Sequence, residues 1–102
     1  MALTKICSGD AVAAGELRQF NVGDVEILVV NFDGRLLCLA ARCTHAGAPL
    51  VEGELSGDIL TCPWHGSRFR VTDGSVVRGP TEKALKMYDC QLQAGDLFVE
   101  VR

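Results

Sequence analysis

The sequence has no cluster of lysine and arginine. Its 10 basic residues are outnumbered by 13 acidic ones, and the formal net charge is −3. A nucleic acid is therefore disfavoured as the main partner, because no basic surface is available to displace counterions from phosphates. A protein partner that presents a basic surface fits this charge better.

Long hydrophobic runs are also missing. The longest apolar stretch, residues 25–30, contains Glu26 and is far too short to cross a bilayer. No signal peptide is predicted either, because Ser8-Gly9-Asp10 interrupts the short apolar segment at the N-terminus. We therefore expect a soluble, cytoplasmic protein.

Length and cysteine content narrow the class further. A chain of 102 residues is expected to form one small domain, with no room for a separate catalytic domain. Nearly half of the residues (48%) are hydrophobic, which is typical of a globular chain. Five cysteines are an odd number, so a secreted disulfide framework is disfavoured and metal binding is favoured.

The local patterns predict an all-β domain of short antiparallel strands. Asp33-Gly34 is a strong two-residue hairpin signal, and Asp73-Gly74 and residues 94–96 are expected to turn two further hairpins. Residues 9–15 have room for one helical turn at most. The expected strands are residues 3–7, 17–22, 25–32, 35–40, 59–61, 69–71, 75–77, 87–93 and 97–101.

Both histidines of the chain lie in two loops that also carry cysteines. The first loop, residues 41–54, contains Cys43 and His45, and the second, residues 62–67, contains Cys62 and His65. Two thiols and two imidazoles at this spacing indicate a metal-ligand set. Ordinary buried cysteines and histidines are the alternative, but that alternative would have to hold four times, in two matched pairs.

Two kinds of metal site accept these four donors. Zinc binds two cysteines and two histidines in a closed tetrahedral site, although its cysteines usually come in one pair and its histidines in another. A [2Fe–2S] cluster accepts the same set, with two cysteines on one iron and two histidines on the other. The remaining Cys7, Cys38 and Cys90 fall in predicted strands and are expected to be buried; a Cys7–Cys90 bridge would require the terminal strands to pair.

At these two loops the sequence resembles the Rieske ferredoxin family. The matching segments are Cys43-Thr44-His45-Ala46-Gly47, Cys62-Pro63-Trp64-His65-Gly66-Ser67 and Gly79-Pro80, the last being similar to the family's proline loop. The resemblance implies an antiparallel, barrel-like β-sandwich: one domain, 1–102, with a two-loop cluster-binding subdomain at about 41–80. It also implies one [2Fe–2S] cluster, with Cys43 and Cys62 on the inner iron and His45 and His65 on the outer iron.

Residues near the ligands indicate where the reduction potential lies. High-potential members of the family carry a bracing disulfide, and Ala48 and Trp64 occupy the positions of its cysteines here. Those members also place a serine and a tyrosine hydroxyl near the cluster sulfurs; Ser67 matches the serine, but Phe69 replaces the tyrosine. We therefore expect a potential near the low end of the Rieske range of about −150 to +300 mV.

An exposed apolar tip is expected around the ligands. Trp64, the only tryptophan, is expected to be a docking residue beside the outer iron, because tryptophan is enriched in interface hot spots. Ala46, Ala48 and Leu50 would complete this tip. The residues expected next to the cluster or at the docking surface are Ala46, Gly47, Ala48, Trp64, Gly66, Ser67, Phe69 and Pro80. The acidic residues Glu52, Glu54 and Asp58 are expected to form a solvated loop or to orient a basic partner.

The chain is most similar in these features to soluble ferredoxins of bacterial ring-hydroxylating dioxygenases, which act in aromatic hydrocarbon catabolism. The implied function is transfer of one electron from an NAD(P)H-dependent flavoprotein reductase to a terminal oxygenase, without a membrane or nucleic-acid partner. The chain is not expected to be an enzyme, because a Rieske oxygenase needs a further iron held by additional histidines. The alternatives are a nitrite reductase small subunit, a redox-sensing module and a zinc-stabilised interaction domain.

Overall fold

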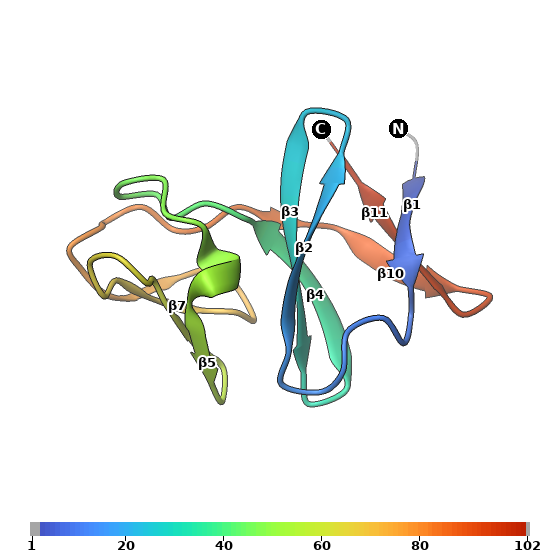
Figure 1. Ribbon diagram of the computed structural model, residues 1–102, viewed down its shortest axis with the longest axis horizontal. Coiled ribbons are helices and arrows are strands. Elements are labelled where there is room, and N and C mark those ends of the chain that lie inside the picture. The colour runs from blue at the N-terminus through green and yellow to red at the C-terminus, as the bar shows by residue number, and fades with distance from the viewer. Residues whose placement is uncertain (1–2, 102) are drawn as a thin grey trace.

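The computed structural model describes residues 3–101, and within this range the regular secondary structure consists of short antiparallel strands and one 3₁₀ turn (Figure 1). The elements are β1 (Leu3–Ser8), β2 (Leu17–Val22), β3 (Val25–Phe32), β4 (Arg35–Ala40), a 3₁₀ turn η1 (Leu50–Glu52), β5 (Glu54–Ser56), β6 (Ile59–Thr61), β7 (Arg68–Arg70), β8 (Val76–Arg78), β9 (Met87–Tyr88), β10 (Cys90–Gln93) and β11 (Asp96–Glu100). They form three sheets, with strand orders β1–β11–β10, β2–β3–β4–β9 and β5–β6–β7–β8. The predicted all-β antiparallel fold is confirmed.

Two hairpins are closed by two-residue turns. The sequence predicts the first of them, Asp33-Gly34, whereas the second is one residue shorter than the predicted turn over residues 94–96, because Asp96 already belongs to β11. Asp33 and Gly34, between β3 and β4, have φ angles of 52° and 88°. Ala94 and Gly95, between β10 and β11, have φ angles of 51° and 85°. Turns with two positive φ angles match the right-handed twist of the flanking strands, so both pairs of strands continue in register from the turn.

The inner strands β3 and β4 of the central sheet β2–β3–β4–β9 are buried on both faces. Alternate residues of a strand point to opposite faces, and residues 27–30 of β3 are all fully buried. The first core cluster lies on the face toward the ligand loops and consists of Leu28, Val30, Leu37, Leu39, Ala41, Cys43, Ala48, Leu50, Leu60, Cys62, Phe69, Val71 and Leu85. The second core cluster lies toward β1 and β11 and consists of Cys7, Val12, Ile27, Val29, Cys38, Leu97 and Val99.

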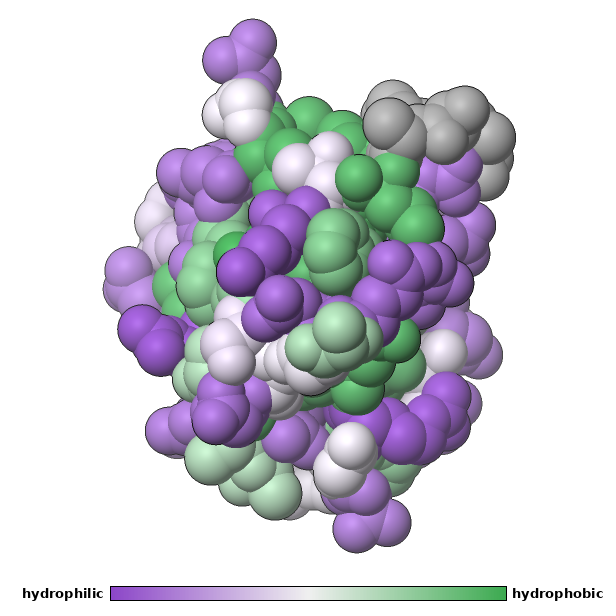
Figure 2. All heavy atoms as spheres, turned by 90° about the vertical axis from the view of Figure 1, so that its right-hand side faces the viewer, coloured by the Kyte–Doolittle hydropathy of each residue, from purple (hydrophilic) through white to green (hydrophobic). Residues whose placement is uncertain are grey.

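The two outer sheets occupy opposite sides of the molecule in Figure 1. The β5–β8 sheet and the ligand loops lie to the left of β2–β4, and β1, β10 and β11 lie to the right. Figure 2 shows the right-hand side, where green apolar side chains are interspersed with purple polar ones. No helix within residues 3–101 is long and apolar enough to span a membrane.

The region predicted as one strand over residues 87–93 is divided between two sheets. β9 ends at Tyr88 and pairs with β4, whereas β10 begins at Cys90 and pairs with β11. Asp89 lies between them, and its carbonyl accepts a hydrogen bond from the N–H of Glu100. Tyr88 and Cys90 both pack against the second core cluster. The alternation of side chains therefore continues through the change of sheet and does not reveal it.

Other segments differ in smaller ways. Residues 9–15 form turns and not a helical turn, and η1 and β5 begin within the stretch predicted as the first loop. Val71 and Ser75 lie just outside β7 and β8. β11 separates β1 from β10, so the terminal strands that carry Cys7 and Cys90 do not pair, and both cysteines are free.

Candidate metal centre

The two ligand loops are closed by the same kind of main-chain hydrogen bond. The N–H of Cys43 donates to the carbonyl of Ala48 at 2.9 Å, and the N–H of Cys62 donates to the carbonyl of Ser67 at 2.8 Å. The fourth residue after each cysteine is a glycine with positive φ: Gly47 at 73° and Gly66 at 76°, a backbone conformation that other residues adopt only at a cost. The two cysteines therefore hold equivalent positions in two similarly folded loops.

The four predicted ligands divide into a buried pair and an exposed pair. Cys43 and Cys62 are each 3% exposed and belong to the first core cluster, and the Cys62 thiol is close enough to raise the pKa of Cys43. His45 and His65 are exposed, and their rings meet edge to face with centroids 4.9 Å apart. The structure thus brings the four side chains together as one pair of sulfurs inside and one pair of imidazoles at the surface.

The surroundings of Cys43 have opposing effects on the pKa of its thiol. Burial raises the pKa of the Cys43 thiol, and the neighbouring Cys62 thiol adds to the rise. The backbone N–H groups of His45 and Ala46 oppose it, and the His45 N–H donates to Cys43 Sγ at 3.5 Å. Such donors stabilise the thiolate, which is the form of cysteine that binds metal, so metal binding here releases protons.

The donor set fits a two-iron cluster. Within the described part of the chain, no three Cys, His, Asp or Glu side chains form a group that could hold a metal ion; the four donors lie instead as two pairs. Thiolate sulfur and imidazole nitrogen are both iron ligands, and two pairs of donors correspond to two irons. Cys43 and Cys62 could hold a buried iron, and His45 and His65 could hold an exposed one.

A third segment, which follows Gly79-Pro80, braces both loops. The N–H of Thr81 donates to the Ser67 hydroxyl at 3.2 Å, and the hydroxyls of Thr44 and Thr81 lie 2.7 Å apart. Since the Thr44 hydroxyl donates to the Lys83 carbonyl at 2.6 Å, Thr81 supplies the proton between the two threonines. Sequence reasoning missed Thr44 and Thr81; the available signal was a hydroxyl residue between two ligands and another directly after the proline.

An ion pair anchors the first loop to the central sheet. The Arg42 guanidinium donates two hydrogen bonds to the Glu26 carboxylate, at 3.1 and 3.0 Å, and a third to the Gly47 carbonyl at 3.2 Å. The bonds from Arg42 hold the pKa of Glu26 below its usual value. The sequence does not suggest this contact, because Glu26 and Arg42 come together only through the pairing of β3 with β4.

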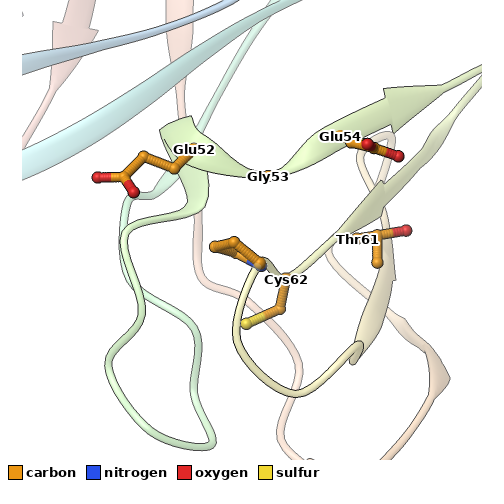
Figure 3. A pocket seen from close by; sticks show the side chains of 6 residues that line it. Glu52, Gly53, Glu54, Thr61 and Cys62 are labelled. Carbon is orange, nitrogen blue, oxygen red and sulfur yellow. The ribbon is translucent and has the colours of Figure 1, made fainter.

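An open cleft of about 350 Å³ lies beside Cys62 (Figure 3). It is lined by Glu52, Gly53, Glu54, Thr61, Cys62 and Pro63. Gly53 is required here because a Cβ at this position would lie 2.3 Å from the Thr61 carbonyl oxygen. In Figure 3 the Cys62 sulfur points downward, away from Glu54 and toward neither carboxylate. Glu52 and Glu54 lie on either side of Gly53 and line the cleft together with Cys62, while Asp58 pairs with Arg70 at 3.3 Å.

The expected apolar tip is narrower than predicted. Trp64 is 56% exposed, and the exposed residues around the histidines are Ala46, Gly47, Pro63, Gly66 and Pro80. Ala48 and Leu50 were expected in the tip, but both are fully buried in the first core cluster. The Leu50 N–H donates to the Ala41 carbonyl at 3.0 Å and draws this part of the loop onto the sheet. Ser67 and Phe69 are also fully buried.

The sequence matches the Rieske [2Fe-2S] domain over residues 2–89. The chain therefore belongs to the Rieske [2Fe-2S] family. A ferredoxin chain from a structure described as the complex of reduced oxygenase and oxidized ferredoxin in carbazole 1,9a-dioxygenase has the same fold, with a TM-score of 0.89 and 30% sequence identity. The likeness covers 95% of this chain and 100% of that chain.

Relatives of known role define the functional class. The biphenyl 2,3-dioxygenase ferredoxin component of Rhodococcus jostii (strain RHA1) is 36% identical over 101 residues, which are 99% of this chain and 94% of the relative. The cytochrome b6-f complex iron-sulfur subunit of Chlorobaculum tepidum is 36% identical over 87 residues, 85% of this chain but only 46% of that relative. The protein is thus an electron carrier of the Rieske ferredoxin type and not an enzyme, with a [2Fe–2S] cluster held by two cysteines and two histidines.

Proposed function

We propose that this protein carries one electron from an NAD(P)H-dependent flavoprotein reductase to a ring-hydroxylating terminal oxygenase in the cytoplasm. The likeness to a biphenyl dioxygenase ferredoxin component extends over nearly all of both chains and supports this role. The similar ferredoxin in complex with an oxygenase supports direct docking to such a partner. The observation that carries the proposal is the buried thiol pair beside an exposed imidazole pair.

In this proposal Cys43 and Cys62 hold the inner iron, and His45 and His65 hold the outer iron. The cluster, when bound, takes up and releases one electron. The buried thiols keep one half of the site away from water, whereas the exposed imidazoles reach the surface. A partner that covers the two histidines would therefore receive the electron across a short distance.

Ser67 is proposed to set the potential together with Phe69. The Ser67 hydroxyl accepts the Thr81 N–H, and this bond leaves its own proton available for donation to a cluster sulfur. Such a bond favours the reduced form. Phe69 is as deeply buried but has no hydrogen to donate in this way. One donor in place of two supports a potential near the low end of the Rieske range, about −150 mV.

The docking surface is proposed to centre on Trp64. This side chain is exposed within the second ligand loop, next in sequence to His65. A large exposed aromatic group beside the electron exit is the kind of residue that anchors protein interfaces. Glu52 and Glu54 flank the same loop and supply negative charge for a basic partner.

A low-temperature EPR spectrum of the anaerobically purified, dithionite-reduced protein tests the cluster and its ligands. We expect a rhombic signal with an average g value below that of all-cysteine clusters. In His65→Cys a thiolate replaces a neutral imidazole, and we expect the potential to fall by about 100 mV or more. Trp64→Phe is the matched control and should leave the potential unchanged. A silent spectrum from colourless, zinc-containing protein would instead support a zinc-stabilised interaction domain.

Electron delivery is tested separately by stopped-flow mixing. The reduced protein is mixed anaerobically with the oxidised oxygenase component of biphenyl 2,3-dioxygenase, and transfer is followed by absorbance. Rapid reoxidation of the carrier is expected. A protein that has the EPR signal but holds its electron in the presence of the oxygenase would contradict this role and favour a redox-sensing module.

A further inference from the structure

A second group of thiols lies on the far side of the central sheet from the ligand loops. Cys7 and Cys38 belong to the second core cluster, and Cys90 packs against it, whereas Cys43 and Cys62 belong to the first. All of these cysteines are free. The electron-carrier function makes no use of Cys7, Cys38 or Cys90, so their arrangement calls for a separate explanation.

Cys38 and Cys90 are neighbours that come from different sheets. Cys38 lies in β4 opposite Tyr88 of β9. Cys90 comes two residues after Tyr88 and begins β10. Cys90 Sγ lies 3.6 Å from the carbonyl oxygen of Leu36, which is two residues before Cys38 on β4. Cys90 also packs against the second core cluster, to which Cys38 belongs, and each of the two thiols shifts the pKa of the other. Cys38 and Cys90 therefore lie close together where the chain passes from the central sheet to the outer sheet.

Cys7 shares the second core cluster with Cys38, but the topology separates it from Cys90. In the outer sheet β11 lies between β1 and β10, and it pairs Leu97 with Cys7 and Val99 with Cys90. Cys7 and Cys90 are therefore separated by the width of one strand and by two positions along β11. The sequence expectation of a possible Cys7–Cys90 bridge thus gives way to Cys38 as the partner of Cys90.

The two thiols of the pair differ in access to solvent. Cys38 is fully buried, whereas Cys90 is half-buried and lines an open pocket of about 280 Å³. The pocket walls are Gly34, Arg35, Leu36, Cys90, Gln91, Leu92 and Leu97. Arg35 brings a positive charge to this pocket, which favours an anionic reagent. A small molecule can therefore reach Cys90 first, with Cys38 directly behind it.

The pKa shifts of the two thiols also favour reaction of Cys90 before Cys38. The hydrogen bond from Cys38 lowers the pKa of Cys90 to about 7, against the opposing effect of burial. The same bond, together with burial, raises the pKa of Cys38. Since the thiolate is the nucleophile, Cys90 is the thiol of this pair that attacks a reagent at neutral pH.

We propose that Cys90 and Cys38 form an oxidisable thiol pair that reacts with low-molecular-weight disulfides such as glutathione disulfide. The Cys90 thiolate attacks one sulfur of the small disulfide, which forms a mixed disulfide and releases one small thiolate. The Cys38 sulfur then attacks Cys90 Sγ, loses its proton and releases the second small thiolate. Two protein thiols are oxidised to one disulfide, one small disulfide is reduced to two thiols, and the two protons pass to the released thiolates.

The resulting Cys38–Cys90 bridge would join β4 of the central sheet to β10 of the outer sheet. It would form on the face of the sheet opposite the cluster ligands, because the two groups of cysteines belong to different core clusters. Oxidation of the pair is therefore expected to leave the cluster spectrum unchanged. This separation makes the visible absorption of the cluster an internal control for the integrity of the fold.

The test uses the complete protein with its cluster in the oxidised state. The protein is incubated anaerobically with glutathione disulfide, its free thiols are blocked by alkylation under denaturing conditions, and peptides are mapped by mass spectrometry. In the wild-type protein we expect Cys38 and Cys90 to be linked and Cys7 to be alkylated. Cys38→Ser should retain glutathione on Cys90, and Cys90→Ser should react at least about tenfold more slowly. Cys7→Ser is the matched control and should behave as the wild type.

The wild-type peptide map decides the question even where a variant fails to fold. A free Cys90 beside a modified cysteine elsewhere would overturn the proposal. A glutathione adduct that stays on wild-type Cys90 without linkage to Cys38 would overturn the pairing. Loss of the cluster absorption at the rate of thiol oxidation would show that the reagent attacks the ligand cysteines, and this result would also count against the pair.

Discussion

Ser67 and Phe69 are both fully buried, two residues apart, yet only Ser67 can donate a hydrogen bond through its side chain. Phe69→Tyr adds a second donor, and we expect it to raise the reduction potential by about 50 mV, the equivalent of one hydrogen bond for a one-electron couple. Ser67→Ala should lower the potential by a similar amount. Voltammetry of the purified variants gives both values.

Thr44→Val is the control for these two substitutions. It breaks the threonine network that ties the first loop to residues 81–83 but removes no donor proposed to face the cluster. It should reduce stability and leave the potential unchanged. An unchanged potential in Phe69→Tyr, with an intact EPR signal, would mean that the added hydroxyl does not reach a cluster sulfur.

Gly53 shows how a single missing side chain supports the second ligand loop. We expect Gly53→Ala to destabilise the protein by about 2–3 kcal/mol in urea unfolding, because the new Cβ would be forced against the Thr61 carbonyl. Gly57→Ala is a useful comparison. Gly57 has a positive φ of 59° but open space around a Cβ, so the cost should be only about 1 kcal/mol. Equal effects of the two substitutions would contradict the steric explanation.

At the scale of elements, the β3–β4 hairpin holds the first loop through Glu26 and Arg42. The folded pKa of Glu26 is below its ordinary value of 4.5, so the contribution of the ion pair is complete above that value and is lost as the pH falls through the folded pKa. Glu26→Gln should therefore speed cluster loss about twofold at neutral pH. The difference in the rate of cluster loss between this variant and the wild type should disappear in acid.

Asp58→Asn is the control for this pH dependence. It removes the Asp58–Arg70 ion pair, which has similar exposure but does not contact the first loop. Cluster loss in Asp58→Asn should follow the wild type at every pH, as monitored by visible absorption. A variant Glu26→Gln that differs from the wild type only below pH 4.5 would contradict the proposed role of the pair.

The elements that the sequence predicted well are those fixed by local chemistry. Asp33-Gly34 determines a turn with two positive φ angles, and β2, β3 and β4 have the predicted bounds. The division between β9 and β10 was not predictable, because it depends on which sheet each half joins. β5 was missed for a related reason: its three residues form a strand only because β6 lies beside them.

In the candidate site, too, the features fixed by local sequence were predicted and those that depend on tertiary contacts were not. The spacing of Cys43, His45, Cys62 and His65 indicated a ligand set, and the fold brings these residues together. Ala48 and Leu50 were misplaced because their small and apolar side chains suit either an exposed tip or a core. The contacts of Arg42 and Thr81 join segments far apart in the sequence, so no local pattern could reveal them. The boundary of a subdomain at residues 41–80 stays a prediction.

At the scale of the whole molecule, two large apolar side chains of nearly equal exposure allow a direct test of docking. Trp64 is 56% exposed in the second ligand loop, and Leu92 is 57% exposed in β10 of the outer sheet. Trp64→Ala should weaken binding to the oxygenase component about tenfold, because exposed tryptophans often anchor interfaces. Leu92→Ala should leave binding unchanged. Isothermal titration calorimetry measures both, and equal losses would place the docking surface elsewhere.

The negative charge of the molecule leads to one further expectation. If Glu52 and Glu54 guide a basic partner to the cluster, electron transfer to the oxygenase should become slower as salt is added. The double substitution Glu52→Gln and Glu54→Gln should reduce both the rate at low salt and its dependence on salt. Stopped-flow rates over a series of ionic strengths measure this, and a salt-independent rate in the wild type would contradict electrostatic guidance.

The matching main-chain hydrogen bonds that close the two ligand loops have a consequence for the rate of electron transfer. The hydrogen bonds from Cys43 to Ala48 and from Cys62 to Ser67 belong to the main chain, so the protein itself holds the backbone of both ligand loops in place. Groups that are held in place in advance need little rearrangement when charge changes. A small reorganisation energy follows, and with it fast electron exchange between carriers of equal potential, even where the driving force toward a partner is slight.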